Sequence, residues 1–245
     1  MELPHAYARS LEEDGYCVIP DVLDAASVND MRSRLVAASA RSEARGVPTH
    51  VVHLDPNDKN VRVFNLLDLD PAFAALVTHP WALLLARNLL ADDFIVSDVN
   101  ANIAQPGSGS MVIHSDLAVV VPPPWTEPWS INVIWCLDDI WEGNGATRYL
   151  PGSHRFRAMG DLPEDMAGEM EPFEARAGSV LAMDGRLWHT SGENTSRDDE
   201  RALLFVYYTR SSIRARWDFE GRLSAATKAT LSPEVRKYLG LRGSP

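Results

Sequence analysis

The sequence predicts a mainly β fold with flanking helices, on three observations. Residues 94–104 alternate apolar and polar side chains, which is typical of a half-buried strand. Three later stretches, 130–138, 177–184 and 201–209, have the apolar composition of buried strands. The 245 residues, 45% of them hydrophobic, include 16 prolines, which fits a globular chain with many turns.

The stretch before residue 93 is expected to form a helical flank that packs outside the sheets. Its apolar residues recur mostly with the period of a helix, and prolines and glycines separate the segments. In chain order we expect a helix at 5–15, a short strand at 16–20, a longer helix at 21–45, strands at 49–54 and 61–67, and one or two amphipathic helices at 71–90.

After residue 93 the pattern is β, and the polar stretch 155–175 reads as an insertion between sheets. The tail ends in a predicted helix at 233–241. No repeat and no linker interrupts the chain, so we expect one domain over 1–245. Its parts would be a helical flank at about 1–92, a β core at about 93–210 and a C-terminal tail at 211–245.

Two histidines and one aspartate form the candidate metal site. His114 and Asp116 stand one residue apart, and His189 follows much later in the chain. Two imidazoles with one carboxylate are the ligand set that suits non-haem Fe(II) and leaves positions open for chemistry. If residues 114–116 lie on a strand, alternation places both ligands on one face, and a later strand can deliver His189. These residues are therefore our candidates for both metal binding and catalysis.

Arg201 opens the apolar run at 201–209 and is the candidate anchor for an acid. A buried, unpaired charge is very costly, so an arginine at the start of a buried strand needs an anionic partner. Its planar guanidinium pairs a carboxylate with two parallel hydrogen bonds. The pattern indicates an iron site beside an acid-bearing co-substrate.

Three stretches carry a resemblance to a known family. They are 114–116 (H-S-D), 144–154 (N-G-A-T-R-Y-L-P-G-S-H) and 188–194 (W-H-T-S-G-E-N), the last running on to Arg201. Together they resemble the phytanoyl-CoA dioxygenase-like branch of the Fe(II)/2-oxoglutarate-dependent oxygenases. The resemblance implies a double-stranded β-helix (jelly-roll, cupin-like) core, with O2 and 2-oxoglutarate as co-substrates. It also implies His114, Asp116 and His189 on iron, Arg201 on the distal carboxylate of 2-oxoglutarate, and Thr147 as a further co-substrate contact.

Two positions depart from the family pattern. Members often have a glutamine shortly before the first ligand, where this chain has Met111; Gln105 or Ser110 could compensate. Many relatives place the arginine one residue earlier, at the position of Glu200 here. An extra loop residue explains this spacing, and Arg197 stays the alternative anchor.

Composition limits the partners and the compartment. The formal net charge of −11 argues against nucleic acid and anionic membranes, because both attract basic surfaces. Cys17 and Cys136 read as buried free thiols, which favours a reducing cytoplasm. We see no signal peptide pattern and no apolar stretch long enough for a membrane span. A homodimer stays open.

The substrate is expected to be a small, mostly apolar metabolite, as in secondary metabolism. Asn65 belongs to a segment that resembles the active-site mouth of relatives, and Leu117, Trp125 and Trp129 belong to a proline-rich segment beside the metal motif. These four residues are our candidate substrate contacts. Hydroxylation is the default reaction, with desaturation or rearrangement as variants. Alternatives are an oxygenase acting on an amino acid derivative, a non-oxygenase metal-dependent cupin-like enzyme, and a non-catalytic sensor.

Overall fold

Two antiparallel sheets form the centre of the computed structural model, which describes residues 2–117 and 126–241. The large sheet has the strand order β1-β7-β4-β9-β3-β2, and the small sheet has the order β6-β5-β8. This is the jelly-roll arrangement expected from the sequence. The strands are β1 (Tyr16–Ile19), β2 (Asn60–Val63), β3 (Phe94–Ala104), β4 (Ser130–Cys136), β5 (Thr147–Tyr149), β6 (Glu171–Pro172), β7 (Val180–Asp184), β8 (His189–Ser191) and β9 (Arg201–Arg210).

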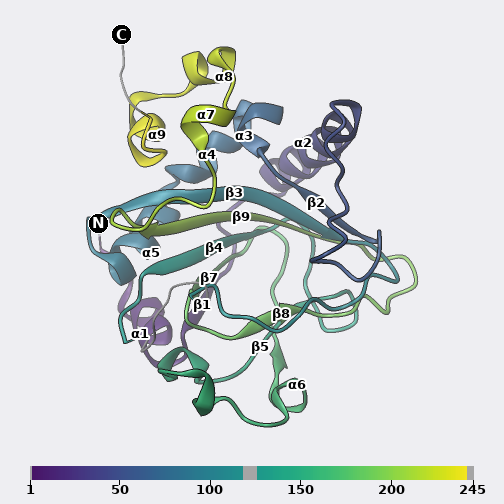
Figure 1. Ribbon diagram of the computed structural model, residues 1–245, viewed down its shortest axis with the longest axis vertical. Coiled ribbons are helices and arrows are strands. Elements are labelled where there is room, and N and C mark those ends of the chain that lie inside the picture. Colours follow the sequence, from purple (N-terminus) through teal and green to yellow (C-terminus); the bar gives the residue numbers. More distant parts are fainter. Residues whose placement is uncertain (1, 118–125, 242–245) are drawn as a thin grey trace.

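Most helices cover one face of the large sheet, and the small sheet lies on its other side (Figure 1). The N-terminal flank also contributes two strands to the large sheet. They are its edge strands, β1, which pairs with β7, and β2, which pairs with β3. The helices are α1 (His5–Glu13), α2 (Ala25–Ala44), α3 (Leu66–Leu69), α4 (Ala74–Val77), α5 (Pro80–Leu90), α6 (Met166–Glu169), α7 (Phe219–Arg222), α8 (Ala225–Thr230) and α9 (Pro233–Tyr238), with 3-10 turns at Pro71–Phe73, Ser153–Arg155 and Met159–Asp161.

Side-chain alternation in the large sheet separates the main core from the site. On β9, Leu204 and Val206 point to the helices and join the main hydrophobic core. The alternate residues Phe205 and Tyr207 point the other way, toward the small sheet, where they line a cavity. Because successive side chains of a strand face opposite ways, one strand supplies both surfaces.

A β-bulge interrupts this alternation in β3. The pairing of β3 with β9 shifts register between Val96 and Asp98. Val96 and Val99 consequently both face the helices, although an odd number of positions separates them. The extra residue, Ser97, binds the chain beyond β9, since its hydroxyl accepts from the backbone N–H of Arg216 at 2.9 Å.

Two predicted strands in the flank were wrong or too long. Residues 49–54 form no strand, and residues 52–54 form a turn in which the backbone N–H groups of Leu54 and Asp55 bond back to the carbonyl of Val51. The strand predicted at 61–67 ends at Val63. Asn65 has a left-handed φ of 55°, which breaks the strand and starts α3.

Within the described residues, no helix is both long and apolar enough to cross a membrane by itself. The bent pair Pro71–Val77 and Pro80–Leu90 passes that test when its helices are taken together.

Candidate metal centre

His114, Asp116 and His189 come together between the two sheets, with one potential ligand atom of each within 4.8 Å of the others. His189 is the first residue of β8. The backbone of His114 forms an isolated antiparallel bridge with it, through N–H···O bonds of 2.9 and 2.8 Å. The third candidate ligand therefore lies on a later strand, as the sequence suggested.

The expectation that residues 114–116 lie on a strand was wrong. Only His114 pairs with a neighbour, and Asp116 lies in a turn. Ser115 stabilises that turn, because its hydroxyl donates to the carbonyl of Gly185 at 2.9 Å and accepts from the N–H of Leu117 at 3.2 Å. The turn, and not the pleat of a strand, brings the carboxylate next to the imidazoles.

Backbone carbonyl groups fix the tautomer of both imidazoles. Nδ1 of His114 lies 2.9 Å from the carbonyl of Val112, and Nδ1 of His189 lies 2.9 Å from that of Leu187. A carbonyl can only accept, so Nδ1 carries the proton and Nε2 keeps its lone pair for a metal. Burial, and then the nearby charge of His114, lowers the pKa of His189 to about 4, which keeps this imidazole neutral at neutral pH.

The two oxygens of Asp116 have different surroundings. Oδ1 accepts a hydrogen bond from Nη2 of Arg216 at 3.0 Å, whereas Oδ2 is buried and has no partner among the described residues. Burial by itself raises the pKa of Asp116, but Arg216 and the two imidazoles outweigh it, and the net pKa is lowered. One ionised oxygen and two imidazole nitrogens are a donor set that fits Fe(II).

Arg201 is a buried cation, and one of its three guanidinium nitrogens has no partner among the described residues. Nε donates to the carbonyl of Gly145 at 3.0 Å and Nη1 to Oδ1 of Asn102 at 3.0 Å. Nη2 is buried and has no partner among the described residues. Burial, and then the charge of Arg62, lowers the pKa of Arg201 to about 10, so it stays charged at neutral pH. An unused donor on a buried cation is what an acid-bearing ligand would satisfy.

The asparagine-glycine pair before Thr147 explains part of this arrangement. Gly145 has a φ of 86°, and a Cβ there would lie 3.2 Å from the carbonyl oxygen of Gly192. Glycine thus permits the close approach that aims its carbonyl at Arg201. The two stretches around 144–154 and 188–194 meet at this point.

One cavity of about 150 Å³ joins the metal candidates to the candidate anchor. Thr147 lines it and is largely buried, at 8% exposed. The lining consists of Arg62, Asn100, Asn102, Met111, His114, Asp116, Asn132, Ile134, Thr147, Met183, His189, Ser191, Arg201, Phe205, Tyr207 and Arg216.

Comparison with known proteins gives the family. The model for phytanoyl-CoA dioxygenase (PhyH) matches residues 11–202. The chain belongs to this family of non-haem iron, 2-oxoglutarate-dependent dioxygenases. It is 46% identical over 231 residues to "Dioxygenase af480" of Aspergillus fumigatus, a match that covers 94% of this chain and 75% of that protein. It is 31% identical over 144 residues to the iron/alpha-ketoglutarate-dependent dioxygenase ausU of Aspergillus calidoustus, covering 56% of this chain and 47% of that one.

Solved structures share the fold of this dioxygenase. HygX from Streptomyces hygroscopicus, with nickel, 2-oxoglutarate and hygromycin B bound, superposes with a TM-score of 0.68 at 18% identity, over 88% of this chain and 90% of that one. The carbocyclase SnoK from nogalamycin biosynthesis superposes with a TM-score of 0.67 at 22% identity, over 85% and 84%.

The structure shows where the positions that depart from the family pattern lie relative to the cavity. Met111 itself lines the cavity of the dioxygenase, and its sulfur contacts Nη2 of Arg62. Gln105 instead donates to Glu200, and Ser110 is exposed; neither lines the cavity. Arg197 is exposed in the loop before β9, also outside the cavity.

The candidate substrate contacts lie outside the described lining of this cavity. Leu117 is buried in a small cluster with Leu150, Met170 and Trp188. Trp129 is 38% exposed. Asn65 lines a separate hollow. Trp125 lies outside the described residues, and substrate contact stays a prediction for all four.

Sequence reasoning missed four polar groups of the cavity wall. The polar positions of β3 were a usable signal for Asn100 and Asn102, because alternation places both on the inner face. Arg62 and Arg216 were not assigned to the site: Arg62 lies on the short edge strand β2, and Arg216 lies in the irregular chain beyond β9.

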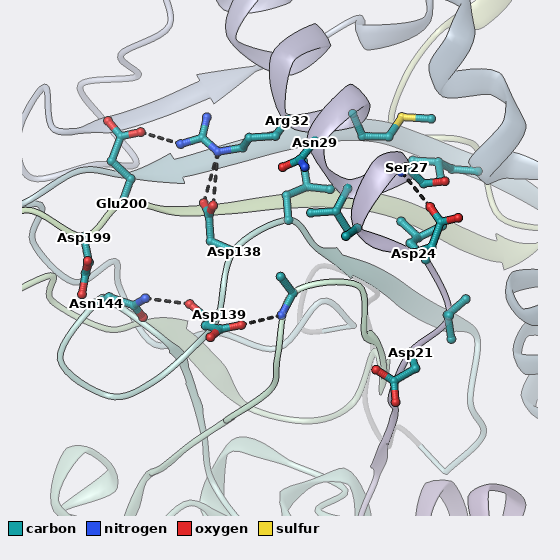
Figure 2. A pocket seen from close by; sticks show the side chains of 18 of the residues that line it. Asp21, Asp24, Ser27, Asn29, Arg32, Asp138, Asp139, Asn144, Asp199 and Glu200 are labelled. Atoms are coloured by element: carbon teal, nitrogen blue, oxygen red, sulfur yellow. Dashed lines mark hydrogen bonds and ion pairs between the residues drawn. The ribbon is translucent and has the colours of Figure 1, made fainter.

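A second, larger hollow is lined by acidic residues, and some of these hold structural elements together. It measures about 1500 Å³ and lies between α2 and the loops before β5 and β9 (Figure 2). Two of its carboxylates have structural partners: Arg32 bonds Asp138 at 3.2 Å and Glu200 at 2.5 Å, and Asp138 also accepts from the N–H of Ala202 at 2.8 Å. Among the described residues, a cluster that could hold a metal occurs at His114, Asp116 and His189 and not here.

Proposed function

We propose that this dioxygenase oxidises a C–H bond of a small metabolite, with Fe(II) on His114, Asp116 and His189 and 2-oxoglutarate on Arg201. The observation that carries the proposal is a pair of unsatisfied buried atoms in one cavity. Oδ2 of Asp116 lacks a cation, and Nη2 of Arg201 lacks an anion. A metal would satisfy the first atom, and a dicarboxylate would satisfy the second.

Each residue has a defined part in this proposal. The histidines offer Nε2 lone pairs, Asp116 offers Oδ2, and Arg201 pairs the distal carboxylate of the co-substrate. The hydroxyl of Thr147 offers a further hydrogen bond to 2-oxoglutarate. When bound, iron, 2-oxoglutarate and O2 together supply the oxidising power for attack on a C–H bond. Ile134, Met183 and Phe205 give the cavity an apolar wall that limits competing water.

We propose a mostly apolar secondary metabolite as the substrate. The names of similar proteins support only the secondary-metabolite part of this proposal: HygX is solved with hygromycin B, and SnoK belongs to nogalamycin biosynthesis. The apolar part rests on Ile134, Met183 and Phe205 in the cavity wall. Hydroxylation is the expected reaction. Desaturation or rearrangement would result if the substrate, once its C–H bond is attacked, reacted in another way. An amino acid derivative is the second substrate class. We place the enzyme in the cytoplasm, because both cysteines are free and buried.

Anaerobic titration with Fe(II) and 2-oxoglutarate tests the proposal. We expect the visible metal-to-ligand charge-transfer band of a bound iron–2-oxoglutarate pair. Arg201→Ala should lose the band at low co-substrate and regain it only at much higher concentration. Arg197→Ala is the matched control, because this arginine lies in the exposed loop, and it should titrate like the parent.

Two outcomes would redirect the assignment. Iron binding without the band would favour a different metal-dependent enzyme or a sensor, although those alternatives leave Nη2 of Arg201 without an anion. A loss of co-substrate affinity in Arg197→Ala, with none in Arg201→Ala, would move the anchor to Arg197.

A further inference from the structure

Arg216 reaches the metal site from the chain beyond β9. Its Nη2 lies 3.0 Å from Oδ1 and 3.0 Å from the backbone carbonyl of Asp116. Its guanidinium stacks over the ring of Tyr207, 4.0 Å from the ring centroid. The residue lies outside the stretch matched by the family model, which ends at residue 202.

The backbone around Arg216 is held in place by the bulge of β3. The N–H of Arg216 donates to the hydroxyl of Ser97, and the N–H of the next residue, Trp217, donates to the carbonyl of Ser97, both at 2.9 Å. Trp217 in turn stacks on Phe64, with ring centroids 6.2 Å apart and ring planes 7° from parallel. Anchoring on two consecutive residues restricts where the guanidinium can go.

Asp98 is the other buried carboxylate near Arg216. Its Oδ2 accepts a hydrogen bond from the amide of Asn100 at 2.7 Å, and its Oδ1 has no partner among the described residues. The close ion pair of Arg216 is with Asp116, at 3.0 Å. A charge-assisted bond to one oxygen favours the carboxylate orientation in which that oxygen is not available to a metal.

We infer that Arg216 is a positioning residue that holds Asp116 with only Oδ2 toward the metal. Carboxylates bind metals through one or both oxygens, and two-oxygen binding would occupy a position that the co-substrate needs. Arg216 prevents this by keeping Oδ1 engaged. The inference rests on the proposed function, since it assigns a role toward the same iron site.

The test compares Arg216→Met and Arg216→Lys with Arg214→Met, without substrate. Arg214 is exposed two residues earlier on the same segment and is the matched control. Visible absorption of Co(II), added without 2-oxoglutarate, reports the ligand set directly. In the Fe(II) complex, we expect Arg216→Met to need about tenfold more 2-oxoglutarate for half of the charge-transfer band. Its Co(II) spectrum should differ from that of the parent, Arg216→Lys should lie between the two, and Arg214→Met should match the parent.

Each result decides the inference separately from the proposed function. Parent-like Co(II) and Fe(II) titrations in Arg216→Met would overturn it, and would leave Arg216 to contact the substrate. If that variant does not fold, parent-like titrations in Arg216→Lys overturn it equally. A parent that binds Co(II) but forms no band with Fe(II) and 2-oxoglutarate contradicts the proposed function. In that case a changed Co(II) spectrum in either Arg216 variant still supports the positioning role.

Discussion

At the residue scale, the polar side chains of the site share one property: the protein fixes some of their atoms and leaves one free. His114 and His189 are held at Nδ1, Asp116 at Oδ1, and Arg201 at Nε and Nη1. The remaining atoms, two Nε2, one Oδ2 and one Nη2, are left for ligands. Holding a side chain at one end orients its other end, so the site is preorganised before any ligand binds.

Thr147→Val tests the proposed contact to the co-substrate. Valine has nearly the same shape but lacks the hydroxyl, so it removes one hydrogen bond without opening a cavity. One such bond is worth about 1 kcal/mol, and we expect the 2-oxoglutarate requirement to rise about fivefold. The charge-transfer titration measures it. Thr190→Val is the control, because that hydroxyl bonds the carbonyl of Met111 and does not line the cavity. Equal titrations for Thr147→Val and the parent would remove Thr147 from the co-substrate site.

The sequence singled out candidates where neighbours along the chain form a motif. Residue type pointed to His114, Asp116 and His189, the start of a buried strand pointed to Arg201, and the structure places all four at one cavity. Arg216 could not be found in this way. Its contact with Asp116 depends on the bulge at Ser97 and on a connection without regular structure, and neither leaves a pattern in the sequence.

At the scale of helices and strands, the periodicity of apolar residues predicted the elements that are buried in a regular pattern. It did not predict the backbone where turns determine its path. The alternation of residues 94–104 predicted β3 with its observed ends. The bulge inside that strand was not predicted, because one extra residue changes the alternation only locally. Asp116 was wrongly predicted to lie on a strand. A short motif that follows apolar residues has the pattern of a strand, and only its hydrogen bonds show that the chain turns there.

Asp138→Ala tests how the scaffold holds Arg201. Asp138 accepts from the N–H of Ala202, the residue after Arg201, and pairs with Arg32 on α2. Removing it leaves the N–H of Ala202 without its partner and leaves Arg32 paired with Glu200 alone, so we expect a loss of about 2 kcal/mol in the free energy of unfolding. The 2-oxoglutarate requirement should rise as well, because the start of β9 loosens. Denaturant unfolding and the charge-transfer titration measure the two effects.

Glu200→Ala is the matched control for that change. Glu200 is the other partner of Arg32, but its side chain is 38% exposed, and exposed ion pairs contribute less than about 1 kcal/mol. The control should therefore unfold close to the parent and bind 2-oxoglutarate normally. If both variants behave alike, Asp138 has no special role in placing Arg201.

At the scale of the whole molecule, one hydrophobic core joins segments from the flank, the sheets and the tail. It contains Leu11 of α1, Val133 of β4 and Tyr238 of α9. Figure 1 shows the tail helices lying beside the flank helices on the same side of the large sheet. The sequence predicted the layers, but not α7 and α8, because helices this short have too few turns for a clear period. A shared core favours cooperative unfolding over separate opening of the flank.

The two cysteines can test whether residues 1–245 unfold as one domain. Cys17 lies on β1 in the flank, Cys136 lies on β4, and both are buried. Burial raises the pKa of each thiol to about 12, and only the thiolate reacts, so alkylation requires opening of the fold. If unfolding is cooperative, iodoacetamide in native buffer should modify both at the same slow rate, measured by mass spectrometry of the two peptides. Cys136→Ala should leave the rate at Cys17 unchanged once differences in stability are corrected. Much faster labelling of Cys17 would show that the flank opens by itself, because β1 pairs with the rest of the large sheet only at its edge, through β7.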